Sequence, residues 1–340
     1  MLPGTPEAAR PVHSEPRRTL PSHLLDRMVQ AAFPHGRALD IEPFTDGLRN
    51  SNFKLRIDSV AEPIVLRVYE HDPTLCQKEV DLLQFLGGLV PVPEVIHAEP
   101  LGAEDLPPFA LLRYVEGITF RELKLGGDTE AIAQAAHSAG ETLAAIHRTV
   151  FPKPGWLSAG PAVTAPLLEG RNPMAGFVDL CLASGNLQQR LPPALREGVH
   201  ALMCSALPEL DLCEEQTNLV HGDFNKRNVL VRPTDGGWAV AAVLDWEFAV
   251  SGPPVTDLAN FLRYERTSRP SAEPFFSNGY LRAGGALPED WRQDWRQVAR
   301  LVDLVALCEM LTRDSRPDWV IVELVELIRA TVEHRDPEFP

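Results

Sequence analysis

The spacing of apolar residues changes character twice along the chain. Over residues 21–33 apolar positions recur every three or four residues, which predicts a short amphipathic helix. From about residue 41 the period falls to two. Apolar and basic residues alternate over 53–57, and 64–69 is a β-branched, apolar run with one basic residue inside it, so both segments predict strands. Beyond Gly117 the helical spacing returns.

The first part of this pattern predicts a small lobe of strands with one internal helix. That helix is expected to begin at Asp72-Pro73 and to stop at Gly87-Gly88, because Asp caps a helix, Pro suits its first position and Gly ends it. Further strands are expected near 94–97 and over 109–115. This order favours a mostly antiparallel sheet, so residues 21–112 are predicted to form an N-terminal lobe.

The remainder, residues 113–340, is predicted to be a mainly helical C-terminal lobe. Thr119 and Glu122 fit a capping box, and apolar residues between Ile132 and Val150 mark one face of a long helix. Further helices are expected over 173–186, 193–207, 255–265, 291–312 and 318–332. One β-hairpin interrupts them, with its first strand, turn and second strand at 229–231, 233–237 and 238–244.

Length and composition are those of a globular protein with a sizeable core. The chain has 340 residues, of which 44% are hydrophobic and 23% charged. The formal net charge of −15 argues against a nucleic acid or an anionic membrane as the main partner, because both need a basic face. The same charge permits a cationic substrate.

Cysteine usage and the N-terminal residues predict a cytoplasmic protein. The five cysteines are scattered singly without a C-x-x-C pair, which is typical of reduced thiols. Residues 1–20 are rich in proline and charge and are predicted to form a flexible tail, with none of the apolar segment of a secretory signal. No apolar run of 18 residues occurs, so no membrane span is expected.

Three polar side chains around the hairpin predict a site for a metal-bound phosphate. Asp223 and Asn228 are five positions apart, and Asp245 follows on the far side of the hairpin. Mg²⁺ prefers oxygen ligands, which carboxylates and carboxamides supply. Phosphoryl transfer needs such ligands together with a carboxylate near the acceptor hydroxyl. The spacing is that of the kinase catalytic loop H-R-D-x-x-x-x-N, with Gly222 in place of Arg.

These residues resemble a known superfamily. The run from His221 to Asn228, followed by Leu244-Asp245-Trp246-Glu247, is similar to that of the aminoglycoside phosphotransferase and choline kinase superfamily of small-molecule kinases. The resemblance implies an α+β, two-lobed protein-kinase-like fold. It also implies that Asp223 is the catalytic base and that Asn228 and Asp245 bind Mg²⁺. ATP is the implied donor, with GTP left open.

Nucleotide-binding motifs follow in matching order in the N-terminal half. Residues 47–53 resemble the loop G-L-x-N-x-N-[FY] of the choline- and thiamine-kinase-like branch. Gly47 would let the backbone approach phosphate, and the side chains of Asn50, Ser51 and Asn52 offer donors.

Arg67 lies inside a predicted strand, where its charge needs a partner, and Glu79 on the next helix is the candidate. The antibiotic kinases usually have Lys at this position, whereas the choline-kinase-like branch often has Arg. The planar guanidinium can hold phosphate and carboxylate together, so Arg67 is expected to contact the nucleotide, although a purely structural ion pair remains an alternative.

The resemblance extends to two further segments, the connection between the lobes and a motif that supports the catalytic loop. Residues 109–117 resemble the segment between the lobes, with Tyr114 and Val115 expected to contact the adenine. Residues 252–259 resemble G-x-P-x-x-D-L-A, in which Asp257 is expected to brace the catalytic loop.

Several other side chains near these motifs could serve the site or pack in the core. Glu247 could face the metal or the acceptor. His147, at a predicted helix end, is expected to pack in the core. The late aromatic residues could line an acceptor pocket or pack the core: Tyr264, Phe275, Phe276, Tyr280, Trp291 and Trp295.

The sequence therefore predicts an ATP- and Mg²⁺-dependent phosphotransferase that acts on a hydroxyl of a small molecule, as aminoglycoside phosphotransferases do. The alternatives are a choline- or thiamine-type metabolite kinase and a nucleotide-binding pseudokinase. A protein kinase is disfavoured, because the segment between Asp245 and Asp257 lacks A-P-E and is too short to dock a peptide. No motif identifies the acceptor, and the acidic composition favours an amine.

Overall fold

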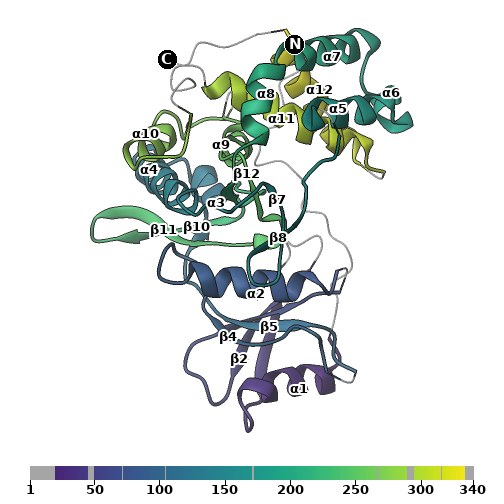
Figure 1. Cartoon of the computed structure of the whole chain (residues 1–340). Coiled ribbons are helices and arrows are strands. Elements are labelled where there is room, and N and C mark those ends of the chain that lie inside the picture. The colour runs from purple at the N-terminus through teal and green to yellow at the C-terminus, as the bar shows by residue number, and fades with distance from the viewer. Residues whose placement is uncertain are drawn as a thin grey trace.

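A computed structural model of the chain describes residues 20–44, 50–70, 72–103, 105–170, 172–265, 268–288, 295–314 and 316–333. The chain forms two lobes, a smaller one built on a sheet and a larger, mainly helical one (Figure 1). The two-lobed α+β fold expected from the sequence is confirmed. The predicted tail up to residue 19, Gly47 and Trp291 lie outside the described residues.

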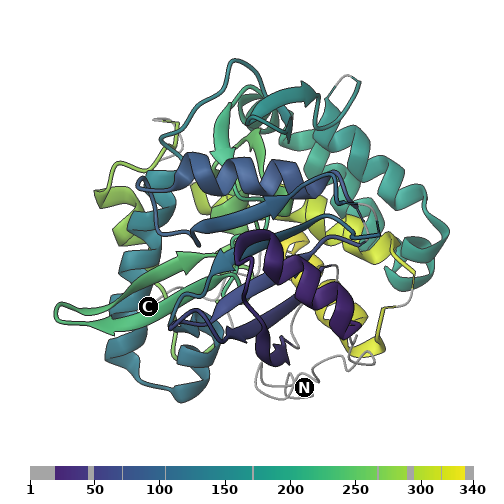
Figure 2. The same ribbon diagram turned by 90° about the horizontal axis from the view of Figure 1, so that it is seen from below.

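The smaller lobe contains a five-stranded antiparallel sheet. Its strands, in spatial order, are β1 (Ala38–Pro43), β2 (Ser51–Ile57), β3 (Ile64–Val68), β5 (Phe109–Arg113) and β4 (Val95–Glu99). Helices α1 (Ser22–Ala32) and α2 (Leu75–Leu86) cover its two faces (Figures 1 and 2).

Side-chain alternation along the strands explains the two covered faces. On β5, Phe109 and Leu111 pack in the cluster that contains the apolar face of α1, whereas Ala110 and Leu112 pack with α2. This is the consequence of a two-residue period in a sheet buried on both faces. Figure 1 shows α2 between the sheet and the larger lobe, so this helix is placed to carry side chains to the lobe boundary.

The larger lobe combines ten described helices with two small antiparallel sheets. The helices are α3 (Phe120–Gly126), α4 (Thr129–Ile146), α5 (Pro173–Ala183), α6 (Gly185–Arg190), α7 (Pro193–Ser205), α8 (Leu207–Glu214), α9 (Val255–Leu262), α10 (Phe275–Arg282), α11 (Trp295–Thr312) and α12 (Asp318–Val332). One sheet has the order β11 (Gly237–Val243), β10 (Val229–Thr234), β6 (Ile118–Thr119). The other has the order β8 (Ala162–Ala165), β7 (Gly155–Ser158), β12 (Val250–Gly252), β9 (Asn218–Val220). None of the helices in the described part of the chain is both long and apolar enough to cross a membrane.

Several predicted helix boundaries were wrong. Val150 is not helical, because α4 ends at Ile146 and Val150 then forms a bridge with Asn218. The helix expected from Asp72 begins at Leu75, although Asp72 still accepts a hydrogen bond from the backbone of Thr74 (3.1 Å). The helices expected over 173–186, 193–207 and 255–265 end at Ala183, Ser205 and Leu262.

The hairpin and some short elements also differ from expectation. Thr234 pairs with Gly237, so the turn consists of Asp235 and Gly236 instead of the five residues expected. The four-stranded sheet and helices α6, α8 and α10 were not predicted. The capping box at the start of α3 is confirmed, since Thr119 and Glu122 bond reciprocally.

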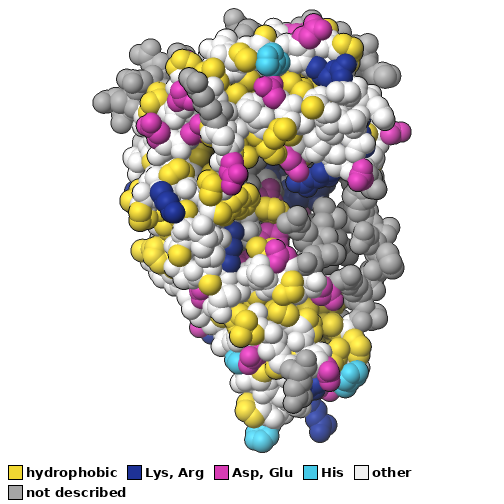
Figure 3. Space-filling model, turned by 45° about the vertical axis from the view of Figure 1, so that its right-hand side comes forward, with side chains coloured by type: hydrophobic (Ala, Val, Ile, Leu, Met, Phe, Trp, Pro, Cys, Tyr) yellow, Lys and Arg dark blue, Asp and Glu magenta, His cyan; other side chains and the backbone are white. Residues whose placement is uncertain are grey.

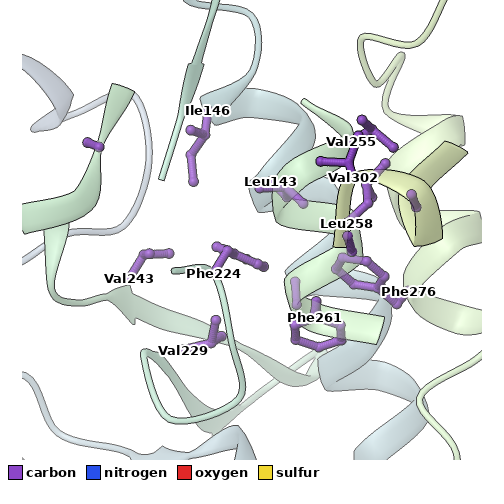
Figure 4. Packing of buried hydrophobic residues seen from close by; sticks show 14 of the residues in the cluster. Leu143, Ile146, Phe224, Val229, Val243, Val255, Leu258, Phe261, Phe276 and Val302 are labelled. Atoms are coloured by element: carbon purple, nitrogen blue, oxygen red, sulfur yellow. The ribbon is translucent and has the colours of Figure 1, made fainter. Parts of the chain in front are cut away.

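An aromatic cluster anchors the catalytic stretch to the helices (Figure 4). The Phe261 ring on α9 stacks on Phe276 of α10 at 4.0 Å between ring centroids, and Phe224 lies 5.8 Å from Phe261. Phe224, Phe261 and Phe276 are fully buried in the cluster that includes Leu143 and Ile146 of α4. Phe276 and Tyr280 are thus core residues, so the packing alternative holds for both. Because Phe224 follows Asp223, this core fixes the backbone next to the proposed base.

Candidate active site

The loop between β9 and β10 holds Asp223 with two neighbouring amides. Asn225 Nδ2 donates to Asp223 Oδ1 at 2.8 Å, and Asn228 Nδ2 donates to Asp223 Oδ2 at 2.9 Å. Burial raises the pKa of the Asp223 carboxyl, and the nearby charge of Asp245 adds to this, while the hydrogen bonds oppose it. The carboxylate is therefore oriented and more basic than that of an ordinary aspartate.

Asp257 braces this loop from the first turn of α9, as expected. Its carboxylate accepts hydrogen bonds from the backbone N–H of His221 (2.7 Å) and of Gly222 (2.9 Å). The ring of His147 lies 3.1 Å from the same carboxylate and 2.8 Å from the Tyr280 hydroxyl, fully buried. His147 is therefore a packed core residue that positions the brace.

Gly222 permits the sharp turn before Asp223. Its φ is +81°, a value that side-chain-bearing residues rarely adopt. A Cβ at this position would lie 2.4 Å from the carbonyl oxygen of Phe248. The departure from H-R-D at this position is thus required by the close approach of two backbone segments.

The hairpin returns the chain so that Asp245 lies near Asn228. The backbone N–H of Leu244 donates to the carbonyl of Asn228 at 2.8 Å, which places the two predicted metal ligands at adjacent strand ends. Asp245 has a left-handed backbone (φ 67°) and its side chain is 32% exposed. Asn228 uses its amide nitrogen on Asp223, so its side-chain oxygen is the atom that can face a cation. A carboxylate and a carboxamide oxygen that stay partly accessible fit Mg²⁺, which keeps water and phosphate as its remaining ligands.

Arg67 is the centre of a charged network between the lobes. Its Nε lies 2.8 Å from Glu79 Oε2, as the sequence predicted, and its Nη2 lies 2.5 Å from Asp245 Oδ1. Burial alone would lower the pKa of Arg67, but Glu79 and Asp245 outweigh it and raise that pKa well above its usual value. Glu79 also accepts hydrogen bonds from the Tyr69 hydroxyl (2.6 Å) and from the backbone N–H of Trp246 (3.1 Å).

Two further contacts, which sequence reasoning missed, tie the smaller lobe to Glu247. Asn50 Nδ2 donates to Glu247 Oε2 at 2.8 Å, and Lys78 Nζ donates to the backbone carbonyl of Glu247 at 2.8 Å. All three side chains are buried. The carboxylate of Glu247 is therefore directed at Asn50, a residue of the predicted nucleotide loop.

The remaining predicted nucleotide contacts lie around this network. Asn52 on β2 is paired with Arg67 on β3, and the hydroxyl of Ser51 donates to Glu70 at 3.1 Å. Tyr114 and Val115 lie in the segment between β5 and β6, with the Lys54 ammonium 4.3 Å from the centroid of the Tyr114 ring. This segment connects the two lobes, which is where the hinge was expected.

The larger lobe contains a small groove. It lies between α9, α11 and α12 and has a cavity volume of about 50 Å³. Asn260 on α9 donates to the carbonyl of Gly222 (3.1 Å) and accepts from Arg263 (2.8 Å), so one wall of the groove is joined to the loop that carries Asp223. The surface is hollowed between the lobes, with basic and acidic side chains in the hollow (Figure 3). The groove is lined by Ala259, Leu262, Arg263, Trp295, Arg296, Ala299, Arg300, Asp303, Leu307, Leu327 and Thr331.

The sheet lobe is joined to a helical lobe that carries Asp223, Asn228 and Asp245, and Arg67 of the sheet lobe contacts Asp245. This is the architecture of kinase-like phosphotransferases. The profile of the phosphotransferase enzyme family matches residues 40–301, and the chain belongs to this family. The resemblance to the aminoglycoside phosphotransferase and choline kinase superfamily is thereby confirmed. The members of this family are phosphotransferase enzymes.

Solved structures share the fold at low sequence identity. The ternary complex of a thermostable mutant of aminoglycoside phosphotransferase APH(4)-Ia with ADP and hygromycin B aligns with a TM-score of 0.62 and 18% identity, covering 92% of this chain and 98% of that one. The GDP complex of an aminoglycoside 2'-phosphotransferase gives 0.66 and 17%, with coverage of 92% and 98%. A putative fructosamine-3-kinase from Thermobifida fusca gives 0.59 and 18%, with coverage of 91% and 98%.

The curated proteins that are similar in sequence are named as acyl-CoA dehydrogenases and not as phosphotransferases. Acyl-CoA dehydrogenase family member 11 of Homo sapiens is 28% identical over 217 residues, which is 62% of this chain and 24% of that protein. The protein of the same name in Gallus gallus is 28% identical over 238 residues, 65% of this chain and 27% of its own length. The chain therefore spans about a quarter of the length of these relatives.

Proposed function

We propose that the protein transfers the γ-phosphoryl group of ATP to a hydroxyl of a small molecule in the presence of Mg²⁺. The observation that carries this proposal is the meeting of Asp223, Asn228 and Asp245 at the ends of one loop and one hairpin. GTP is an alternative donor, since similar folds are known in complexes with ADP and with GDP.

In this proposal Asp223 orients the acceptor hydroxyl and accepts its proton. Its raised pKa makes the carboxylate a better proton acceptor than a free aspartate, and the amides of Asn225 and Asn228 fix its direction. Asn228 and Asp245 would hold Mg²⁺, which neutralises phosphate charge when bound.

The smaller lobe would supply the nucleotide contacts. Asn50, Ser51 and Asn52 belong to the predicted nucleotide loop, together with Gly47. Arg67 orients Asp245 through its 2.5 Å contact, and its guanidinium lies where it can also meet phosphate oxygens. Tyr114 and Val115 in the connecting segment are the proposed adenine contacts.

The acceptor is a small hydroxylated molecule in this proposal, and known proteins suggest two kinds to test. Similar structures are named as aminoglycoside phosphotransferases and as a putative fructosamine kinase. The curated relatives are named acyl-CoA dehydrogenases, which makes a hydroxylated acyl-CoA a second candidate.

The test is an acceptor screen with purified protein, ATP and Mg²⁺. Aminoglycosides, choline, thiamine, homoserine, fructosamines and hydroxylated acyl-CoA thioesters are each incubated, and ADP and phosphorylated acceptor are measured together. We expect ADP release that depends on one acceptor class and stops when Mg²⁺ is chelated. ATP binding without Mg²⁺-dependent hydrolysis or transfer to any acceptor would instead support a pseudokinase.

A further inference from the structure

One charged side chain of the loop between β9 and β10 is buried. Lys226 lies between Asp223 and Asn228 in the sequence, and its side chain is 6% exposed. Its Nζ donates to the backbone carbonyl of Phe261 at 2.8 Å and lies 2.9 Å from Glu265 Oε1. A buried ammonium group is costly without such partners, so these two contacts determine where the side chain lies.

The residues on both sides of Lys226 hold the proposed base. Asn225 Nδ2 donates to one oxygen of the Asp223 carboxylate, and Asn228 Nδ2 donates to the other. The same residues form a turn, because the backbone N–H of Asn228 donates to the carbonyl of Asn225 at 3.1 Å and that of Arg227 donates to Asn225 Oδ1 at 2.8 Å. Lys226 therefore belongs to the turn that presents both amides to Asp223.

The contacts of Lys226 join this turn to the helix that also braces the start of the loop. Phe261 is on α9, and it belongs to the buried aromatic cluster of Figure 4. Asp257, in the first turn of the same helix, accepts hydrogen bonds from the two backbone N–H groups that precede Asp223. Helix α9 thus contacts the loop before Asp223 through Asp257 and after it through Lys226.

Glu265 has a second basic partner, which lies outside the loop. Lys124 on α3 places its Nζ 2.5 Å from the same oxygen, Glu265 Oε1, and its side chain is 4% exposed. Burial would raise the pKa of Glu265, but Lys226 and Lys124 outweigh it and lower that pKa, so the carboxylate is charged. The two lysines therefore share one buried carboxylate, and of the two only Lys226 belongs to the loop.

We infer that Lys226 is a positioning residue for the proposed base: its buried ammonium group holds the turn of residues 225–228 against α9, and this turn holds the Asp223 carboxylate. The inference rests on the proposed function and adds a residue to it. An uncharged side chain would lose the contacts with Phe261 and Glu265, so the turn could shift relative to α9. A displacement of about 1 Å at a reacting group can lower a rate by about a hundredfold.

The test compares Lys226→Met with Lys124→Met. Each variant removes one of the two ammonium groups from the same buried carboxylate, and methionine supplies an unbranched, flexible side chain without a charge. The two variants differ in that Lys226 is in the loop and Lys124 is on α3. Urea denaturation measures the free energy of unfolding of both, so a loss of activity that only follows stability is recognised.

We expect Lys226→Met to lower kcat for the acceptor found in the screen by about tenfold or more, while KM for ATP changes by less than about twofold. The reason is that the orientation of the base is lost and the nucleotide contacts are kept. Lys124→Met is expected to retain kcat within about twofold of the wild type. A merely structural role of Lys226 would lower stability in both variants without separating kcat from KM.

Hydrogen exchange provides a measurement that needs no turnover. The backbone amides of Arg227 and Asn228 are bonded within the turn. We expect them to exchange about tenfold faster in Lys226→Met than in Lys124→Met, because the turn opens locally when its contacts with α9 are lost. NMR spectroscopy measures the exchange, under conditions in which the two variants are equally stable.

The inference is overturned if the two variants have equal kcat values, or if the amides of the turn exchange at equal rates in both. Failure of the proposed function has a different signature. In that case the wild type transfers phosphate to no acceptor, and the exchange rates alone decide whether Lys226 holds the turn.

Discussion

At the scale of single residues, Arg67 joins three parts of the chain that are distant in sequence. Its guanidinium contacts Glu79 on α2 and Asp245 after the hairpin, while its backbone belongs to β3. The planar guanidinium group of arginine can contact Glu79 and Asp245 at the same time through different nitrogen atoms. The ammonium group of lysine has one nitrogen at the end of a flexible side chain, so it cannot make both contacts.

Replacing Arg67 by Lys is therefore expected to be costly. Lys can approach Glu79 or Asp245 but cannot hold both in the observed geometry, so Asp245 loses its fixed orientation. We expect kcat/KM for ATP to fall by about tenfold or more, equivalent to about 1.4 kcal/mol of transition-state stabilisation. Steady-state kinetics measure this. Arg56→Lys, on the exposed face of β2, is the control, and equal kinetics of the two variants would contradict the proposed role.

Candidate residues that belong to local motifs could be picked out from the sequence, whereas most of their distant partners could not. Asp223, Asn228, Asp245 and Asp257 were candidates because their spacing matches one loop, one hairpin and one helix start, and the structure brings them together. The bond between Asn50 and Glu247 joins positions 197 residues apart, and no local pattern predicts it.

The same limit applies to the groove. Its arginines stand on α9 and α11, so their meeting depends on how these helices pack.

At the scale of elements, the catalytic loop is shaped by two backbone segments that nearly touch. Gly222 has φ +81°, and its α-carbon faces the carbonyl of Phe248. Phe248 ends the short turn that follows Asp245, so this contact sets the distance between the proposed base and the segment that carries the proposed metal ligand Asp245.

Gly222→Ala is expected to damage both stability and catalysis. The new Cβ would lie 2.4 Å from a backbone oxygen in a backbone conformation unfavourable to alanine, a strain of about 1–3 kcal/mol. Urea denaturation and kcat measure the two effects. Gly236→Ala is the control, because the nearest atom to its Cβ lies 4.0 Å away, and it is expected to change neither quantity. A fully active, stable Gly222→Ala variant would show that the loop is not held as described.

Long elements were predictable and short ones were not. Helix α12 was expected over 318–332 and has those bounds, because fifteen residues show the helical period clearly. Strands β7, β8, β9 and β12 have three or four residues each, too few for a two-residue period to be recognised. These strands form through pairing with distant partners, so tertiary context and not local pattern determines them.

At the scale of the whole molecule, several side chains of the smaller lobe contact one short segment of the larger lobe, residues 245–247. Asn50, Arg67, Lys78 and Glu79 all bond to residues 245–247. The carboxylate of Asp245, the proposed metal ligand, is thus positioned by a side chain of the opposite lobe, and a change in the angle between the lobes would alter the site.

Lys78 gives this junction a pH dependence. Burial lowers the pKa of its ammonium from 10.5 to about 8, while Glu79 and Glu247 partly oppose the shift. Between these pH values the unfolded chain binds the proton that the folded protein has lost, so the free energy of unfolding rises with pH. We expect the wild type to gain on the order of 2 kcal/mol relative to Lys78→Met across this window.

Urea denaturation of both proteins at several pH values tests this prediction. Tyr69 and Cys76 also titrate at high pH, but they are present in both proteins, so their contribution cancels in the difference. Parallel stability curves would contradict a lowered pKa of Lys78.

The central claim is that Asp223 is the base of a phosphotransferase, and the most direct measurement compares Asp223→Asn with Asp235→Asn, an exposed aspartate in the hairpin turn. Transfer to the acceptor found in the screen and binding of an ATP analogue with Mg²⁺ are measured for both variants. We predict that Asp223→Asn lowers kcat by about a hundredfold or more while analogue binding persists, and that Asp235→Asn behaves like the wild type. Turnover of Asp223→Asn within about tenfold of the wild type would contradict the account, since a positioned base contributes more than that.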